Sequence, residues 1–442
     1  MTPHLPLSRA SFSAHLYRPY LDLGPADPAA PFHVLGLDFA IRALGENRPY
    51  PRIQSALNPS FREQLLQHTA LPMYRVTAPR DLAPALRTPR WAVLVESVDA
   101  FTDLEPAQQV RLSWLLGKLC LQHCLLELLP RDVETRASRS GHDASLAYLR
   151  ALARYRLQLD DPRQPYSLGE FERVANEAPP GIARVDAHYQ MVVQSVKHKN
   201  DVAAVERWQA LHRRAIETSA HELDAFEQGL VMSRYHRVGG FVPQMRKDRQ
   251  GTVEEMELAE RHARALPTDT AEHRTAALEM LYPVIESRTK EALWLGDKDL
   301  ALERARTLTT LSAHDPRAWL HLGQVYVDRE ELELAADAYR RSARYSPPGR
   351  EVALFMLGQC LEELGQLEAA RDAYVGSLDV DPLGVSAAES LLQLAERLDE
   401  RPLARWAKAH LEQLSAHRAV AVPRAPEPYK NLPAPTELGA RA

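Results

Sequence analysis

The chain has 442 residues, with 54 Lys and Arg against 59 Asp and Glu, a formal charge of −5, and 45% apolar side chains. This composition is that of an ordinary globular protein, and the length allows two or three domains or one elongated repeat array. The mildly acidic balance, with both signs of charge scattered along the chain, argues against a nucleic-acid-binding face and against an anionic-membrane binder, and no run approaches the roughly 18 consecutive apolar residues of a membrane-spanning helix.

Cysteine usage and the N-terminus bear on the compartment. The cysteines, Cys120, Cys124 and Cys360, are too few for a disulfide framework, and the first two lie four residues apart on a predicted helix. Residues 1–14 lack a cationic segment followed by an apolar run of secretory length. We therefore expect a protein of the reducing cytoplasm. Its 46 Arg against 8 Lys indicate a GC-rich, bacterial genome.

The first 105 residues are predicted to form a less regular module. Residues 31–45 and 60–69 have helical spacing, whereas 73–77 and 91–98 fit either strands or a short buried helix. The module is therefore α-helical on one interpretation and α+β on the other.

Residues 106–280 are predicted to be a helical region. The apolar spacing is helical from Pro106 to Leu129. Further helices are predicted at about 142–160, 167–177, 181–199, 201–228, 252–266 and 270–295. These lengths are those of antiparallel helical hairpins.

After residue 290 the sequence repeats itself. The first copy consists of Trp319, Leu322, Gly323, Tyr326, Ala335, Tyr339 and Pro347. Thirty-five residues later comes the second copy, Leu354, Leu357, Gly358, Leu361, Gly365, Ala370, Tyr374 and Pro382. The two glycines are expected where the helices of one hairpin cross, because a side chain there would push the helices apart. The opposing small-residue site falls to Ala335 and Ala370.

This pattern, which begins W-x2-L-G-x2-Y, resembles the tetratricopeptide repeat. Residues 292–316 read as a degenerate earlier copy, and 385–416 as a last hairpin whose second helix, 402–415, is the polar cap that a repeat stack needs. We assign residues 281–418 to repeats and 419–442, rich in proline, to a disordered or extended tail. Residues 106–280 are then either decayed repeats of the same solenoid, which we favour, or an unrelated helical domain.

The resemblance implies a mainly α-helical solenoid, a right-handed superhelix whose inner surface is lined by the first helix of each pair, and the binding of a protein or peptide. The inner positions of the two clear repeats are Arg317, Leu320, Gln324 and Asp328, then Val352, Phe355, Gln359 and Glu362. Lys and Asn that clamp a terminal carboxylate in some members are missing there, so a chaperone-tail role is not expected. The alternative is that these residues pack against the chain's own N-terminal part.

Two other clusters carry polar chemistry. The stretch 233–251, broken by Gly239-Gly240 and Pro243, is predicted as a flexible basic loop able to hold a phosphate or acidic partner, or else as a solvated connection. Its cations are Arg234, His236, Arg237, Arg246, Lys247 and Arg249. On the predicted helix 201–228, Glu217 and His221 share a face with His212 further back, which suits a metal site or an exposed salt-bridged face.

The sequence predicts a non-catalytic adaptor or regulatory scaffold of a bacterial pathway that holds a protein or peptide segment in a helix-lined groove. No cofactor is implied, and nucleotide-binding, serine-hydrolase, zinc-protease and basic helix-turn-helix motifs are missing from the sequence. One alternative is an enzyme or obligatory enzyme subunit, metal-dependent or peptide-modifying, with its chemistry in residues 1–250 and repeats that deliver the substrate. Another is a regulator bound to a separate DNA-binding protein.

Overall fold

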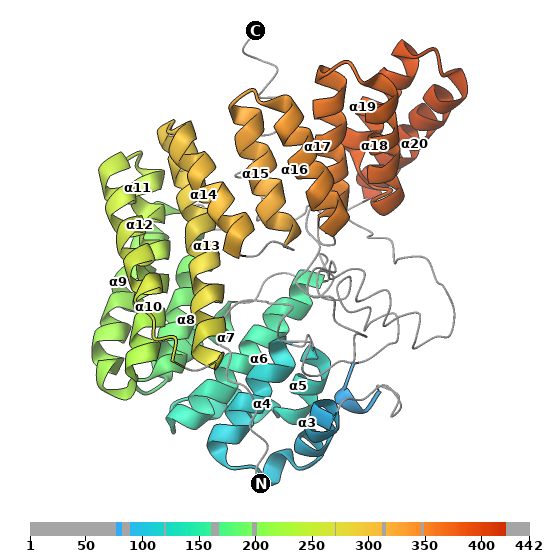
Figure 1. The fold of residues 1–442 in the computed structure, drawn as a ribbon. Helices are drawn as coiled ribbons and strands as arrows, with labels where there is room; N and C mark the ends of the chain where they lie inside the picture. Colours follow the sequence, from blue (N-terminus) through green and yellow to red (C-terminus); the bar gives the residue numbers. More distant parts are fainter. Residues whose placement is uncertain are drawn as a thin grey trace. The chain divides into compact units, whose positions relative to one another are not determined.

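The structure is a computed structural model of the full chain (Figure 1). It describes residues 77–81, 89–118, 121–160, 168–196, 201–269, 271–311, 315–345 and 349–420. Every regular element in these ranges is a helix, which confirms the mainly α fold. The predicted elements at 31–45 and 60–69 lie outside the described residues, as do the element predicted at 73–77 apart from Thr77 and the tail predicted at 419–442 apart from its first two residues. None of the described helices is long and apolar enough to cross a membrane.

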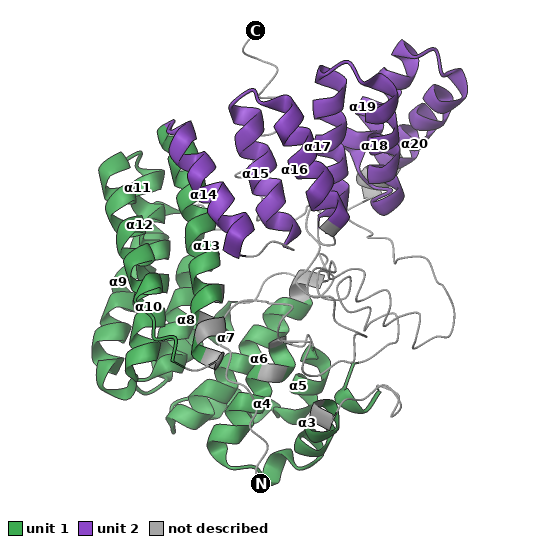
Figure 2. Ribbon diagram, in the orientation of Figure 1, with its two compact units in different colours: residues 1–23, 71–295 green, residues 24–70, 296–442 purple. Residues whose placement is uncertain are grey.

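The chain divides into two compact units (Figure 2). The described residues of unit 1 end at Leu295, and those of unit 2 begin at Gly296. One continuous helix, α13 (Ala271–Leu295), passes through residue 280, where the sequence predicts a boundary, and the division between the units follows the end of this helix.

Unit 1 is built from helical hairpins. Its elements are η3 (Pro79–Asp81), α3 (Pro89–Asp99), η5 (Phe101–Asp103), α4 (Pro106–Lys118), α5 (Gln122–Leu128), η6 (Arg131–Arg136), α6 (Gly141–Asp160), α7 (Gly169–Glu177), α8 (Ile182–Gln194), α9 (Val202–Ser219), η8 (Ala220–Glu222), α10 (Ala225–Gly239), α11 (Phe241–Met245), α12 (Arg249–Arg264) and α13. Helices α6 and α7, α8 and α9, and α10 and α12 pack as pairs, and α6, α8, α10 and α13 contact one another in that order. The hairpins therefore stack with their first helices in one layer.

Residues 91–98 are helical, so the strand alternative is wrong for this segment. Trp91, Leu94 and Val98 are buried at spacings of three and four along α3, which is the period of a helix face. The Trp91 indole N–H donates to the Pro79 carbonyl at 2.8 Å, so the buried donor is paired.

The single helix predicted over 201–228 is also wrong. It ends at Ser219, and α10 begins after Asp224. The Asp224 side chain accepts from the Glu227 backbone N–H at 2.7 Å, and the Glu227 carboxylate accepts from the Asp224 N–H at 3.3 Å. This capping box starts a new helix, and its signature, Asp-x-x-Glu, stands in the sequence.

The flexible loop predicted over 233–251 is a further error, because most of the stretch is helical, in α10, α11 and the start of α12. Its glycines lie at helix crossings. A Cβ on Gly239 would lie 2.5 Å from Glu255 Oε2, and one on Gly240 would lie 3.3 Å from Met256 Sδ. They permit close packing against α12 rather than flexibility.

Unit 2 is a regular stack of hairpins. Its helices are α14 (Lys298–Leu311), α15 (Pro316–Asp328), α16 (Leu332–Tyr345), α17 (Arg350–Glu363), α18 (Leu367–Val380), α19 (Val385–Arg397) and α20 (Arg401–Val420). Helices α15 and α16, α17 and α18, and α19 and α20 form the hairpins, while α16 packs on α17 and α18 on α19. The terminal helix α20 exposes the polar residues predicted for a cap, and it also exposes Trp406, stacked on His410 with ring centroids 5.0 Å apart.

Close helix approach in unit 2 depends on the two predicted glycines. A Cβ on Gly323 would lie 2.6 Å from Tyr339 Cε1, and one on Gly358 would lie 2.5 Å from Tyr374 Cε1. The crossing is therefore filled by tyrosine rings, one turn beyond the buried Ala335 and Ala370 of the predicted small-residue site.

A second repeated feature, a serine hydrogen bond within each hairpin, was not predicted from the sequence. Ser342 Oγ donates to the Pro316 carbonyl, and Ser377 Oγ donates to the Glu351 carbonyl, both at 2.8 Å and both buried. Each bond joins the second helix of a hairpin to the first residues of its first helix. The two serines are 35 residues apart, which is the repeat spacing.

Candidate functional site

The candidate site is the inner face of unit 2, made of the predicted inner positions of α15 and α17. Seven of its eight residues are half-buried and one, Gln324, is buried, with 7% of its surface exposed. The Glu362 carboxylate of α17 pairs with the Arg397 guanidinium of α19. The face is thus partly accessible.

On α15 the polar residues are largely engaged with one another. Arg317 binds its neighbour Asp315, with 2.6 Å between Nη2 and Oδ2, and so belongs to the N-terminal cap of the helix. Gln324 Nε2 donates to Asp328 Oδ1 at 3.3 Å. Burial raises the pKa of the Asp328 carboxyl above its ordinary value. Arg317 is therefore less available to a partner than the sequence predicts.

On α17 the candidate face includes Phe355, which packs against the aromatic ring of Tyr374. The Phe355 ring is 5.9 Å from the Tyr374 ring, which in turn fills the Gly358 crossing. The Tyr374 hydroxyl donates to Glu362 Oε2 at 2.9 Å, and burial raises the pKa of that hydroxyl. Phe355 therefore packs against a buried tyrosine and is itself half-buried.

The predicted anion-binding cations of α10 have partners within unit 1. Arg234 Nη1 pairs with Asp186 Oδ1 at 3.2 Å, and Arg237 Nη2 donates to the Tyr189 hydroxyl at 2.9 Å. His236 Nδ1 lies 2.9 Å from Glu255 Oε2. These contacts join α10 to α8 and α12.

The other three cations lie near the turn between α11 and α12. Arg246 pairs with Glu206 of α9, while Lys247 and Arg249 are exposed. The structure therefore does not bring the six predicted residues into one cluster on a loop.

The predicted metal residues are also separated. His212 is 1% exposed between the rings of Tyr189 and Tyr235, whereas Glu217 and His221 are exposed. His221 follows the end of α9 and lies beside Glu222, at 3.3 Å. Burial lowers the pKa of His212 to about 3. Among the described residues, no group of His, Cys, Asp or Glu is arranged to hold a metal ion.

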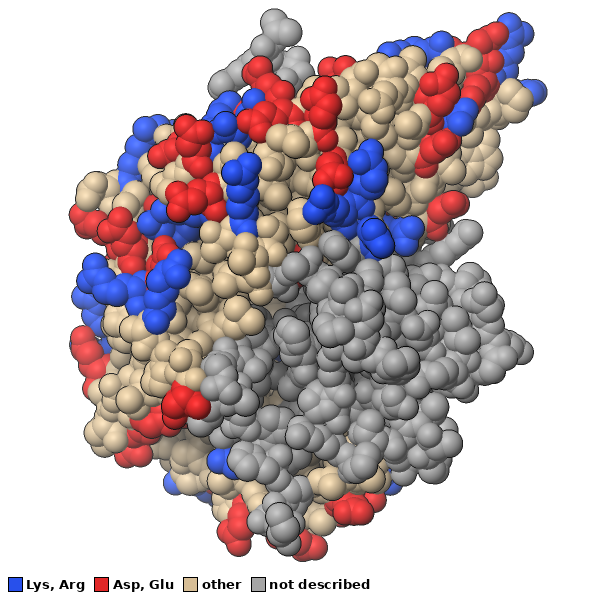
Figure 3. Space-filling view, in the orientation of Figure 1, with Lys and Arg blue, Asp and Glu red and all other residues tan. Residues whose placement is uncertain are grey.

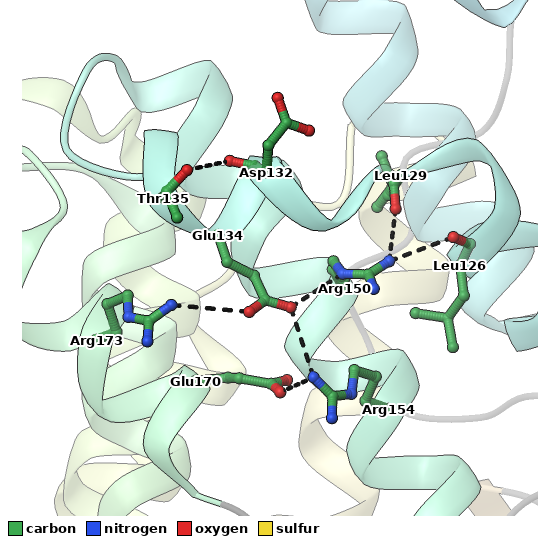
Figure 4. A network of polar contacts seen from close by, with 9 residues as sticks. All are labelled: Leu126, Leu129, Asp132, Glu134, Thr135, Arg150, Arg154, Glu170 and Arg173. Carbon is green, nitrogen blue, oxygen red and sulfur yellow. Dashed lines mark hydrogen bonds and ion pairs between the residues drawn. The ribbon is translucent and has the colours of Figure 1, made fainter.

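A network of charged side chains joins η6, α6 and α7 (Figure 4). The Glu134 carboxylate pairs with Arg150 at 3.0 Å, Arg154 at 3.6 Å and Arg173 at 3.7 Å. Arg150 is buried and also donates to the Leu129 carbonyl after α5. The network therefore connects η6, α6, α7 and the end of α5, in keeping with a structural role for buried, hydrogen-bonded charges.

The thiols that the structure describes are buried. Burial raises the pKa of Cys124 and of Cys360 to about 11, so both thiols are protonated at neutral pH.

Lys, Arg, Asp and Glu are interspersed over the visible face of the described residues (Figure 3).

A family description, tetratricopeptide repeat, matches residues 316–348 and 352–382. Residues 316–382 are tetratricopeptide repeats. They coincide with the hairpins α15–α16 and α17–α18, whose helices close on Gly323 and Gly358. The N-terminal part matches no family.

Several solved structures are similar to the chain. They include MamA (18% identity, 41% of this chain and 97% of that chain, TM-score 0.33), YrrB, described as a TPR protein with an unusual peptide-binding site (16%, 51% and 98%, 0.31), and a human IFIT1 dimer with PPP-AAAA (12%, 74% and 78%, 0.43). At these identities the likeness concerns the fold alone. A comparison with curated proteins found no match.

Proposed function

We propose that the chain is a protein- or peptide-binding adaptor or regulatory scaffold of a bacterial cytoplasmic pathway, and that the inner face of unit 2 holds a segment of the partner. The observation that carries this is Phe355. Its ring contacts the Tyr374 ring, yet the residue is only half-buried, as are Leu320, Val352 and Gln359 of the predicted inner face. A partner segment gains affinity by burying these apolar surfaces, while the neighbouring amides and carboxylates set its orientation.

The test is a pull-down from the native host with the tagged full chain and a Phe355→Asp, Leu320→Asp variant. Leu334, 48% exposed on α16, supplies the control Leu334→Asp, which places the same charge on an apolar residue outside the inner face. Circular dichroism and thermal unfolding establish that each variant folds. We expect a protein partner that is lost in the double variant and retained in the control. A partner retained by the double variant, or no partner at all, contradicts the proposal.

A further inference from the structure

Helix α20, the last described helix of unit 2, buries one face and exposes another (Figure 1). The buried face packs on α19 and includes Ala407 and Leu414, which are 0% and 7% exposed. Next to this face, Trp406 is 48% exposed, and it is the largest apolar side chain that the described residues expose. An exposed tryptophan of this kind is typical of a surface that contacts another protein.

The Trp406 ring is supported by its neighbour on the same helix. It stacks on the His410 ring, with 5.0 Å between the centroids and 8° between the planes. His410 Nε2 in turn donates to the Pro382 carbonyl oxygen at 2.7 Å, just before α19 begins. Trp406 is therefore positioned by a histidine that is bonded to the backbone, although nearly half of the tryptophan surface stays exposed.

Trp406 belongs to a row of exposed residues with the spacing of a coiled-coil seam. Pro402, Trp406, Ala409 and Gln413 follow one another at steps of four, three and four residues, and all four are exposed. These steps place the side chains along one line of the helix, where a second helix packs by inserting its side chains between them. The row contains one bulky residue, Trp406, and the next residue along it, Ala409, is small.

This row is complementary to itself when two copies of α20 run antiparallel. A two-fold axis midway between residues 407 and 408 places Trp406 of each copy opposite Ala409 of the other copy. Each indole ring then fills the space beside a methyl group. A parallel pair would instead place Trp406 against Trp406 and Ala409 against Ala409, so the match of large with small is specific to the antiparallel arrangement.

The residues on either side of the row fit the same arrangement. Arg405 and Glu412 are both exposed and stand seven residues apart, so they lie on one flank of the row. In an antiparallel pair this flank meets itself, and each Arg405 lies near Glu412 of the other copy. On the other flank, half-buried Leu403 and His410 meet in the same way. Size and charge are therefore complementary in one register.

We infer that the chain associates with a second copy of itself through α20. The two helices pack antiparallel, with Trp406 against Ala409 of the other copy and Arg405 paired with Glu412 of the other copy. This surface includes none of the inner-face residues of α15 and α17, so the inference is independent of the function proposed above. Because one helix of 20 residues from each copy makes a small interface, we expect a dimer with a dissociation constant of order micromolar.

The test is sedimentation equilibrium of the full chain over a range of concentrations on both sides of that value. Trp406→Glu places a charge in the centre of the helix pair, and we expect the dissociation constant to rise at least about thirtyfold. Arg405→Glu places a carboxylate near Glu412 of the other copy, twice in each dimer, and weakens the dimer roughly tenfold. The double variant Arg405→Glu, Glu412→Arg again sets opposite charges against each other and recovers most of the affinity.

Two control variants match these changes. Leu334→Glu alters an apolar residue of α16 that is as exposed as Trp406, at 48%. Lys408→Glu reverses the charge of an exposed residue of α20 that lies outside the row and its flanks. We expect both controls to associate as the unaltered chain does. Circular dichroism establishes that each variant is folded.

The inference is overturned if the unaltered chain is monomeric at every concentration, or if the Trp406→Glu variant associates as tightly as the unaltered chain. It is also overturned if the double charge variant is no tighter than Arg405→Glu alone, because an antiparallel pair requires that recovery. A partner that is captured through Phe355 leaves these results unaffected, so the two proposals fail separately.

Discussion

The two units build stacked helical hairpins by different means. In unit 2 the hairpins close on Gly323 and Gly358, each filled by a tyrosine ring, and the pattern repeats every 35 residues. In unit 1 the pairs α8–α9 and α10–α12 are joined by polar contacts such as Arg234 with Asp186. The comparison shows that a repeat motif is one way to pack the helices of a hairpin closely. Stacked hairpins also form in unit 1, which lacks the motif.

The largest effect is expected from breaking the ion pair of unit 1. Arg234→Met leaves the Asp186 carboxylate, which is 2% exposed, without its arginine, and we expect a loss of about 3 kcal/mol in unfolding free energy. The double variant Arg234→Met, Asp186→Leu should lose less, because no charge is then left buried. Urea unfolding of the three proteins checks this. Equal losses in the single and double variants would show that the pair does not couple α8 to α10.

In unit 2 the comparable change is Gly358→Ala. The added Cβ meets the Tyr374 ring at 2.5 Å, so one helix must shift, and we expect a loss of about 2–3 kcal/mol. Gly169→Ala in α7 is the control, because a Cβ there meets no atom within 4 Å. Thermal unfolding monitored by circular dichroism measures both. If the Gly358→Ala protein is as stable as the control, the close approach of the two helices at Gly358 does not contribute to the stability of the repeat.

Acid should weaken unit 1 through His212. Its pKa is about 3 in the folded protein against about 6.5 in the unfolded chain, so only the unfolded chain takes up a proton between these values. Stability is then complete above pH 6.5 and falls as the pH drops toward 3, by about 2 kcal/mol at pH 5. His212→Gln should remove this part of the pH dependence, which denaturant unfolding at pH 5 and 7.5 measures. Parallel pH profiles of the two proteins would contradict the assignment.

The smallest effect concerns the repeated serines. Ser377→Ala removes a buried hydrogen bond to the Glu351 carbonyl, and Ser342→Ala removes the equivalent bond to Pro316; each should cost about 1 kcal/mol. Because the two sites are equivalent, similar losses are expected. Chemical denaturation compares them, and a loss at one site only would show that the two repeats are not energetically alike.

The sequence predicted unit 2 well because its helix contacts are local and periodic. Gly323, Gly358 and their tyrosines recur at a fixed spacing, so a pattern search finds them. Gly239 and Gly240 serve a similar packing role, but their partners, Glu255 and Met256, carry no repeated signal. From the sequence alone, the two glycines therefore predict a loop. The helix boundary at Asp224 is indicated in the sequence by the Asp-x-x-Glu capping box. The apolar spacing alone does not indicate it, because that spacing continues across the boundary.

For the candidate site, the sequence predicts which residues of α15 and α17 line the inner face, but it does not predict their hydrogen bonds or their burial. Hydrogen bonds that occupy Arg317 and Gln324 depend on the side chains of Asp315 and Asp328, which spacing alone does not resolve. The burial of His212 follows from the packing of α8, α9 and α10, which is set by tertiary contacts.

The most direct test of the inner face is photo-cross-linking in the native host. The probe is Phe355→benzoylphenylalanine in the full chain, with Leu334→benzoylphenylalanine on α16 as the control position. We expect the probe at residue 355, and not at 334, to form an adduct with another protein, and mass spectrometry to identify that protein and the segment that carries the adduct. Adducts within the chain itself, or the same adducts from both positions, would contradict a partner-binding inner face.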